Sequence, residues 1–104
     1  MKNHYVYKTT NLKNGMIYIG RRSTLKSPEK DSYKGSGIYL NRAFKIFGKE
    51  NFSKEILEVC NNFENLLLQE IYWIEKLNST NSKIGYNLSS KSISLRYLTV
   101  TPVD

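Results

Sequence analysis

Two short tyrosine-bearing runs near the N-terminus, Tyr5–Tyr7 and Tyr18–Gly20, constrain the fold of this chain most. Each run has the alternation and the β-branched or aromatic residues that are typical of a strand. The turn Lys13-Asn14-Gly15 lies between them, and Asn-Gly between two such runs is the strongest short-range signal of a β-hairpin. We therefore predict that Tyr7 and Tyr18 lie on neighbouring strands of one hairpin.

The rest of the pattern predicts one domain with its elements in the order strand, strand, helix, strand, helix. A loop follows the hairpin, Ser36 is the predicted N-cap of the first helix, and Gly48 is its predicted end. This order predicts an α/β fold of the α+β type, with a small, mainly antiparallel three-stranded sheet flanked by helices. The predicted strands are 4–11, 16–23 and 52–59, the predicted helices are 37–47 and 63–77, the domain is 1–90, and 91–104 is a tail with the propensity for an added strand.

The third strand and its cysteine carry further expectations. Phe52, Ile56 and Val59 are predicted to point inward, and Cys60 to lie reduced at the end of the strand. A lone cysteine forms no internal disulfide, and Cys60 with His4 falls short of the four ligands of a structural zinc site.

The charge of the chain points to a polyanionic partner. Its 104 residues carry a formal net charge of +7 with a pI near 9.5. For a domain of this size, such a charge is the footprint of a nucleic-acid-binding protein, although a merely basic protein is the alternative. Basic residues recur between tyrosines through the first half of the sequence.

Glu70 is the polar residue whose position is most unusual. On a helix, it falls near the centre of an apolar stripe, between Leu66 and Leu67 one turn back and Ile74 one turn ahead. A carboxylate aimed into a core costs several kcal/mol unless it is paired or binds a cation. Glu70 is therefore predicted either to pair with an arginine or lysine or to bind a metal ion.

These residues carry a resemblance to a known family. The runs Tyr5-Val6-Tyr7 and Tyr18-Ile19-Gly20 resemble the paired motifs that name the GIY-YIG nuclease superfamily, with Tyr5 and Val6 replacing the first two residues of the first motif. The likeness extends to Gly85-Tyr86-Asn87, and it is greatest to the catalytic domains of phage homing endonucleases.

The resemblance implies a metal-dependent DNA endonuclease that hydrolyses phosphodiester bonds and leaves 5′-phosphate and 3′-hydroxyl ends. It implies that Glu70 binds one Mg²⁺ or Mn²⁺ and that Asn87 holds the site together. It also implies that Tyr7 or Tyr18 helps to deprotonate the attacking water, and we favour Tyr7 as the base. Nearby cations are expected to lower the tyrosine pKa values. Arg22 is the candidate that offsets charge on the phosphate.

Other residues compete for the arginine role. By strand alternation Arg22 shares a face with Tyr18, and Arg21 points to the opposite face. Arg21 or Arg42 could still fill the role, and Arg42 lies off the apolar stripe of its helix. The predicted contacts to nucleic acid are Arg21, Lys34, Arg42 and Lys45.

A catalytically inactive DNA- or RNA-binding module of the same fold is the competing hypothesis. The altered first motif motivates it, as does the lack of a histidine after the second motif. In either case we expect DNA as the partner, with a homodimer, a separate DNA-binding domain or another protein supplying specificity. We expect no membrane association and place the chain in the cytoplasm of a bacterial or phage-infected cell.

Overall fold

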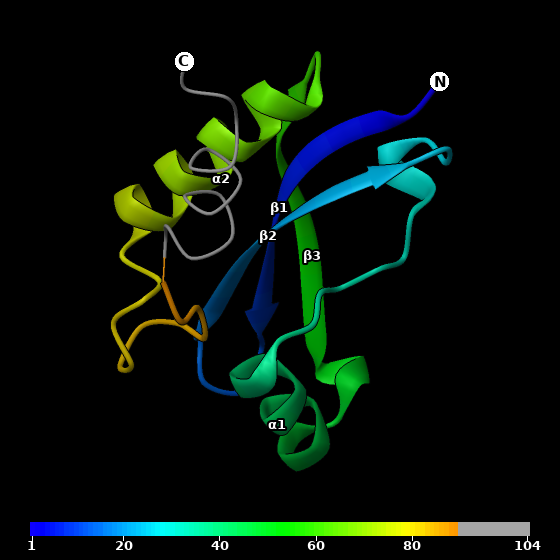
Figure 1. Ribbon diagram of the computed structural model, residues 1–104. Helices are drawn as coiled ribbons and strands as arrows, with labels where there is room; N and C mark the ends of the chain where they lie inside the picture. The colour runs from blue at the N-terminus through cyan, green and yellow to red at the C-terminus, as the bar shows by residue number, and fades with distance from the viewer. Residues whose placement is uncertain (90–104) are drawn as a thin grey trace.

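The computed structural model describes residues 1–89 of the chain, so the predicted tail strand lies outside the described residues. One antiparallel sheet with the strand order β2-β1-β3 forms its centre, and helix α2 runs across one face of it (Figure 1). The three strands and two helices predicted within residues 1–89 are confirmed, and no end moves by more than one residue. The elements are β1 (Asn3–Asn11), β2 (Ile17–Thr24), α1 (Ile38–Phe47), β3 (Phe52–Cys60) and α2 (Phe63–Leu77), with single 3-10 turns at Pro28–Lys30 and Lys49–Asn51.

The alternation of the strands produces two different faces. Val6 of β1 and Ile19 of β2 point toward α2, where they pack against Leu66 and Ile74 in the main apolar core. Burying side chains of this size stabilises a fold by about 1.5–3 kcal/mol each. The opposite face carries the tyrosines of both strands instead. The α2 helix begins at an Asn62 side chain that accepts a hydrogen bond from the Asn65 amide, which caps it.

Helix α1 lies at the end of the sheet where β1 finishes and β3 starts (Figure 1). Its Leu40 and Ala43 are buried against Phe52, and Arg42 lies off this apolar stripe, as predicted from the sequence. Gly48 ends the helix as predicted, with a φ of 88° that favours glycine. The predicted N-cap is wrong, because Gly37 is the residue that precedes the helix. The Ser36 hydroxyl instead accepts a hydrogen bond from the Tyr33 hydroxyl.

Strand β3 contains a register shift that changes which side chains it presents to each face. Opposite residues 6 and 7 of β1 it has one extra residue, so Glu58 and Cys60 turn toward α2. Cys60 is a free, buried thiol, as predicted. Phe52 is buried and Ile56 half-buried, but the prediction for Val59 is wrong because its side chain is 62% exposed on this edge strand.

The segment after α2 covers the outer edge of β2. Ile17 forms a parallel bridge with Gly85, and the amide of Tyr86 donates to the Ile17 carbonyl at 2.8 Å. Gly85 is required at this point, because a Cβ there would lie 2.5 Å from the carbonyl oxygen of Ser79. No helix among residues 1–89 has the length and apolar character needed to cross a membrane.

Candidate active site

The hairpin brings Tyr7 and Tyr18 together, as the sequence predicts. Tyr7 lies opposite Gly20, and Tyr18 lies opposite Thr9, so the two rings occupy the same face with centroids 6.4 Å apart. Gly20 provides the room, since a Cβ there would lie 2.4 Å from the Tyr7 hydroxyl. The absence of a side chain at Gly20, the glycine of the second motif, therefore leaves the space that the Tyr7 ring occupies.

The loop before α1 closes over this pair of tyrosines. Gly35 has a φ of +111°, and a Cβ on it would lie 2.8 Å from the Tyr18 ring and 3.0 Å from the Tyr7 hydroxyl. The backbone of Ser36 forms a hydrogen bond with the Tyr18 hydroxyl. As a result Tyr7 is only 1% exposed, whereas Tyr18 stays half-buried at the edge of the sheet.

The expected lowering of the tyrosine pKa values is wrong. Burial raises the pKa of Tyr7 far above its usual range, and the neighbouring Tyr18 and Tyr33 raise it further. Burial also raises the pKa of Tyr18, to about 12, with a contribution from the negative charge of Glu70. Arg21 and the Ser36 backbone lower the Tyr18 value, but they offset only part of the effect of burial.

Glu70 lies in the interior and has a cation beside it. Its Oε1 accepts a hydrogen bond from Nη1 of Arg21 at 3.0 Å, and only 13% of the Glu70 side chain is exposed. Of the two predicted outcomes, the structure shows the ion pair. Burial raises the pKa of Glu70 and Arg21 lowers it, with a net rise. Arg21 thus points toward α2, on the face opposite Tyr18, as alternation predicts.

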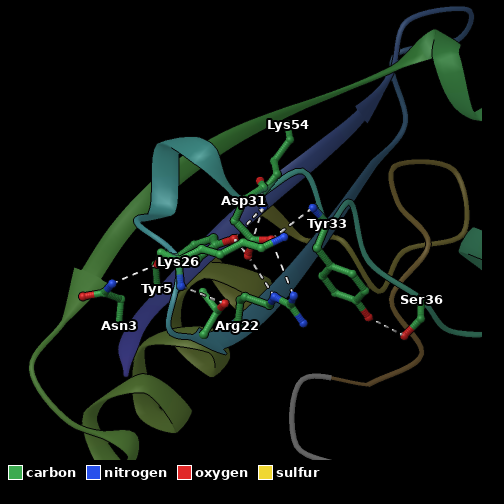
Figure 2. A network of polar contacts seen from close by, with 9 residues as sticks. Asn3, Tyr5, Arg22, Lys26, Asp31, Tyr33, Ser36 and Lys54 are labelled. Atoms are coloured by element: carbon green, nitrogen blue, oxygen red, sulfur yellow. Dashed lines mark hydrogen bonds and ion pairs between the residues drawn. The ribbon is translucent and has the colours of Figure 1, made fainter. Parts of the chain in front are cut away.

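Arg22 lies on the tyrosine face as predicted, and a carboxylate holds it there (Figure 2). Its Nε donates to Oδ2 of Asp31 at 2.8 Å, and its guanidinium lies 4.3 Å from the centroid of the Tyr33 ring. The Tyr5 hydroxyl donates to the same Oδ2 at 2.5 Å, and Lys54 Nζ donates to the Tyr5 hydroxyl and to the Asp31 carbonyl.

This cluster, which we call the Asp31 network, consists of Tyr5, Arg22, Asp31, Tyr33 and Lys54. Its two cations and one carboxylate leave one net positive charge beneath the loop. Burial opposes the charge of Asp31, but the hydrogen bonds from Arg22 and Tyr5 prevail and lower its pKa to about 2. Burial lowers the pKa of Lys54. The network anchors the loop that closes over Tyr7 and Tyr18 (Figure 2).

Asn87 holds strand β2 by its side chain. Its Oδ1 accepts from the Ile19 amide and its Nδ2 donates to the Ile19 carbonyl, both at 2.8 Å. The amide group thus takes the place of a neighbouring strand beside Tyr18. The position fits the role that the family resemblance gives to this asparagine.

Comparisons with known proteins agree with this geometry. The family model described as "Putative endonuclease segE, GIY-YIG domain" matches residues 2–89. The chain belongs to the GIY-YIG family. From Enterobacteria phage T4, "Putative endonuclease segD" is 38% identical over 88 residues, covering 79% of this chain and 38% of segD. Endonuclease segA of the same phage is 34% identical over 104 residues, covering 88% of this chain and 46% of segA.

A solved structure supports the same assignment. The catalytic domain of intron endonuclease I-TevI, solved as a mutant, has a TM-score of 0.66 and 27% identity, covering 88% of this chain and 98% of that domain. The GIY-YIG resemblance and the fold class predicted from the sequence are thereby confirmed. The chain spans less than half of the two phage relatives, so it corresponds to one part of such proteins.

The remaining predicted contacts of this GIY-YIG domain lie outside the tyrosine pair. Lys34 Nζ donates to the carbonyl of Lys49 at 3.1 Å, which ties the loop to the turn after α1. Arg42 and Lys45 are exposed on α1. Within residues 1–89, Arg42 forms no ion pair, unlike Arg21 and Arg22.

Sequence reasoning missed Asp31 and Lys54 of the Asp31 network. Asp31 is one of two acidic residues, with Glu29, in a loop that also carries three lysines, and nothing in the sequence pattern distinguishes it from Glu29. Lys54 alternates with Phe52 and Ile56 on its strand, so its inward position follows once those two point inward. The partnership between them depends on a loop conformation that the sequence pattern does not specify.

Proposed function

We propose that this GIY-YIG domain is the catalytic part of a metal-dependent DNA endonuclease that hydrolyses phosphodiester bonds. The observation that carries the proposal is the largely buried Arg21–Glu70 ion pair at 3.0 Å, whose two charges act on the half-buried Tyr18 of the same strand as Arg21. The phenol and the arginine come from β2 and the carboxylate comes from α2, and together they supply a proton-accepting group, a cation and an oxygen ligand. These are the groups that water attack on a phosphate requires.

In this proposal Tyr18 replaces Tyr7 as the group that takes a proton from the attacking water. Tyr7 is buried beneath Gly35, and its pKa lies further above neutral than that of Tyr18. Tyr18 is half-buried, and the Ser36 backbone and Arg21 both favour its phenolate. Tyr7 then acts as a packing partner that fixes the orientation of the Tyr18 ring.

Glu70 is the proposed metal ligand. Residues 1–89 contain no group of three histidine, cysteine or acidic side chains that would form a complete metal site. One carboxylate fits a Mg²⁺ or Mn²⁺ ion that takes its other ligands from water and substrate phosphates, which is how Mg²⁺ commonly binds. When bound there, such an ion would supply positive charge near the phosphate and the leaving oxygen.

Arg42 is the better candidate than Arg22 for binding the substrate phosphate. Arg22 is committed to Asp31 and Tyr33, and Arg21 is committed to Glu70. The Arg42 guanidinium projects from an exposed position on α1. A phosphate that displaced Arg22 would remove the shorter of the two ion pairs of a buried carboxylate and leave it only the Tyr5 hydrogen bond and Lys54 at 4.0 Å, which opposes the displacement.

Because the chain spans 38% of segD and 46% of segA, we propose that target specificity comes from elsewhere. A further DNA-binding domain, a second copy or a partner protein would provide it. The domain alone is then expected to bind DNA weakly and to cut with little sequence preference. Its expected place is the cytoplasm of a bacterial or phage-infected cell, where the DNA lies.

The raised pKa values of Tyr7 and Tyr18 favour one alternative, a DNA-binding module without catalysis. Incubation of supercoiled plasmid with Mg²⁺ or Mn²⁺ at low salt separates the two. We expect nicking by the wild type, none by Glu70→Gln, and wild-type nicking by Glu64→Gln, which changes an exposed carboxylate on the same helix. DNA binding without nicking by the wild type in either metal would establish the alternative.

A further inference from the structure

A groove lies between α1 and the segment after α2, and of the residues that line it only Arg42 and Asn87 have a role in the site described above. It encloses about 280 Å³ and is lined by side chains of the β1–β2 turn, of α1 and of residues 80–87. Most of its lining surface is apolar, and polar side chains that include Asn14, Arg42 and Asn87 lie among the apolar ones, a mixture that is typical of a ligand site. The lining residues used below are Asn14, Tyr39, Arg42, Ile46, Tyr86 and Asn87.

The groove presents aromatic rings together with a cation. Tyr39 is 45% exposed on α1, and the Arg42 guanidinium lies 5.8 Å from its ring centroid. Across the groove, the Tyr86 hydroxyl accepts from Nδ2 of Asn11 at 2.9 Å and of Asn14 at 3.4 Å, which fixes that ring. Exposed aromatic rings beside arginine are the surfaces on which unpaired nucleobases stack.

The charge of the groove also favours a nucleic acid. Its lining contains Arg42 and no acidic residue, and Arg42 forms no ion pair with any residue of 1–89. Ile46 is 69% exposed beside it. A phosphate alone would pair with Arg42 but would leave Ile46 exposed. A nucleotide has both a phosphate that can pair with Arg42 and an apolar base face that can cover Ile46.

The groove is linked to the candidate active site through Asn87 and Tyr86, and Tyr18 and Tyr86 pack against the same apolar cluster. Asn87 lines the groove with its neighbour Tyr86, and the same side chain holds Ile19, which is next to Tyr18 in β2. A DNA strand whose phosphate lies at Tyr18 therefore has its neighbouring nucleotide within reach of the groove.

We propose that this groove binds an unstacked nucleobase of the DNA strand next to the phosphate that is cut. The base stacks on Tyr39 and contacts Ile46, and Arg42 binds the adjoining phosphate. The inference rests on the proposed function, because it assumes that DNA lies at Tyr18. It makes Tyr39 and Ile46 residues that determine which nucleotide is accepted beside the cut.

The test measures binding without metal, so that cleavage plays no part. The probe is a short single-stranded oligonucleotide with one 2-aminopurine, whose fluorescence is quenched when the base stacks on a ring. We expect quenching by the wild type, loss of quenching in Tyr39→Leu with affinity weakened by roughly 5- to 150-fold, and retention in Tyr39→Phe. The matched control is Tyr72→Leu, since Tyr72 is 48% exposed on α2 away from the groove. It should behave as wild type.

A second variant guards against a folding defect at Tyr39. Ile46→Glu adds a negative charge at an exposed position, and we expect it to weaken binding without changing the circular dichroism spectrum. Equal quenching and affinity in Tyr39→Leu, Ile46→Glu and Tyr72→Leu would overturn the groove proposal, and so would a wild type that does not bind the probe. If the groove variants lose binding but the wild type never nicks plasmid, the groove assignment stands and the endonuclease proposal fails.

Discussion

Replacement of Asp31 by asparagine tests the Asp31 network with little change in shape. The Asp31 side chain is 2% exposed and is paired with Arg22 and hydrogen-bonded to Tyr5. Its fall in pKa from 3.8 to about 2 corresponds to about 2.4 kcal/mol of stability that depends on its charge. The variant also leaves the half-buried Arg22 without its partner. We therefore expect Asp31→Asn to lower the free energy of unfolding by about 2–4 kcal/mol at pH 7.

The pH dependence gives the sharper test. The folded pKa of Asp31 is depressed, so its stabilisation is present above the unfolded value of 3.8 and is lost as the pH falls through about 2. Roughly half of the charge-dependent 2.4 kcal/mol should therefore be lost by about pH 3. Because residue 31 does not titrate in Asp31→Asn, the difference between wild type and variant should shrink by that amount between pH 7 and pH 3.

Urea unfolding followed by circular dichroism is the suitable assay, since urea is uncharged and does not screen the ion pair. Glu55→Gln is the matched control, because Glu55 pairs with Lys8 at 3.5 Å with 64% of its side chain exposed. Such surface pairs contribute about 0–1 kcal/mol. The reasoning is refuted if Asp31→Asn costs no more than Glu55→Gln, or if its cost is the same at pH 7 and pH 3.

Three further results are expected. The wild-type kcat/KM for DNA nicking should rise up to tenfold per pH unit from about pH 7 to pH 9, because the Tyr18 pKa of about 12 keeps the phenolate scarce throughout; a flat profile would exclude Tyr18 as the base. Asn87→Ala should lower the free energy of unfolding by about 2–4 kcal/mol in urea, because two buried groups of Ile19 lose their partners, and a cost below about 0.5 kcal/mol would contradict that. Gly20→Ala should abolish nicking or the fold, because its Cβ would overlap the Tyr7 ring; crystals of an active Gly20→Ala protein with Tyr7 unmoved would disprove this.

The elements of this fold could be predicted because each one is marked by local physics. Period-two alternation and the Asn-Gly turn define the hairpin, and the spacing of Leu66, Leu67 and Ile74 defines α2. The same periodicity placed Glu70 inside the core. A buried carboxylate needs compensation, so the sequence predicted either an ion pair or a metal ion at Glu70, and the structure shows the ion pair with Arg21.

The residue partners could not be predicted in the same way. Alternation assigned Arg21 and Arg22 to opposite faces, yet it could not show that Glu70 and Asp31 meet them, since those contacts span 49 and 9 residues. The N-cap prediction at Ser36 failed for a related reason. The local preference of serine was outweighed by a tertiary contact, because the Ser36 backbone hydrogen-bonds to Tyr18 and its side chain accepts from Tyr33.

The electrostatics of the tyrosines were decided by tertiary structure alone. The sequence shows lysines and arginines near Tyr7 and Tyr18, and positive charge favours phenolates, so the sequence alone predicts lowered tyrosine pKa values. The sequence does not show how deeply the two tyrosine rings are buried. This burial arises when Gly20 and Gly35 let the sheet and loop close on the two rings, and it then outweighs the cations. The sequence by itself determined the strands, the helices, the family likeness and the buried position of Glu70. Only the tertiary structure decided that Tyr7 is buried and Tyr18 stays partly exposed, because the loop held by Asp31 lies over the two rings. The solvation of a side chain depends on atoms that are distant in the chain.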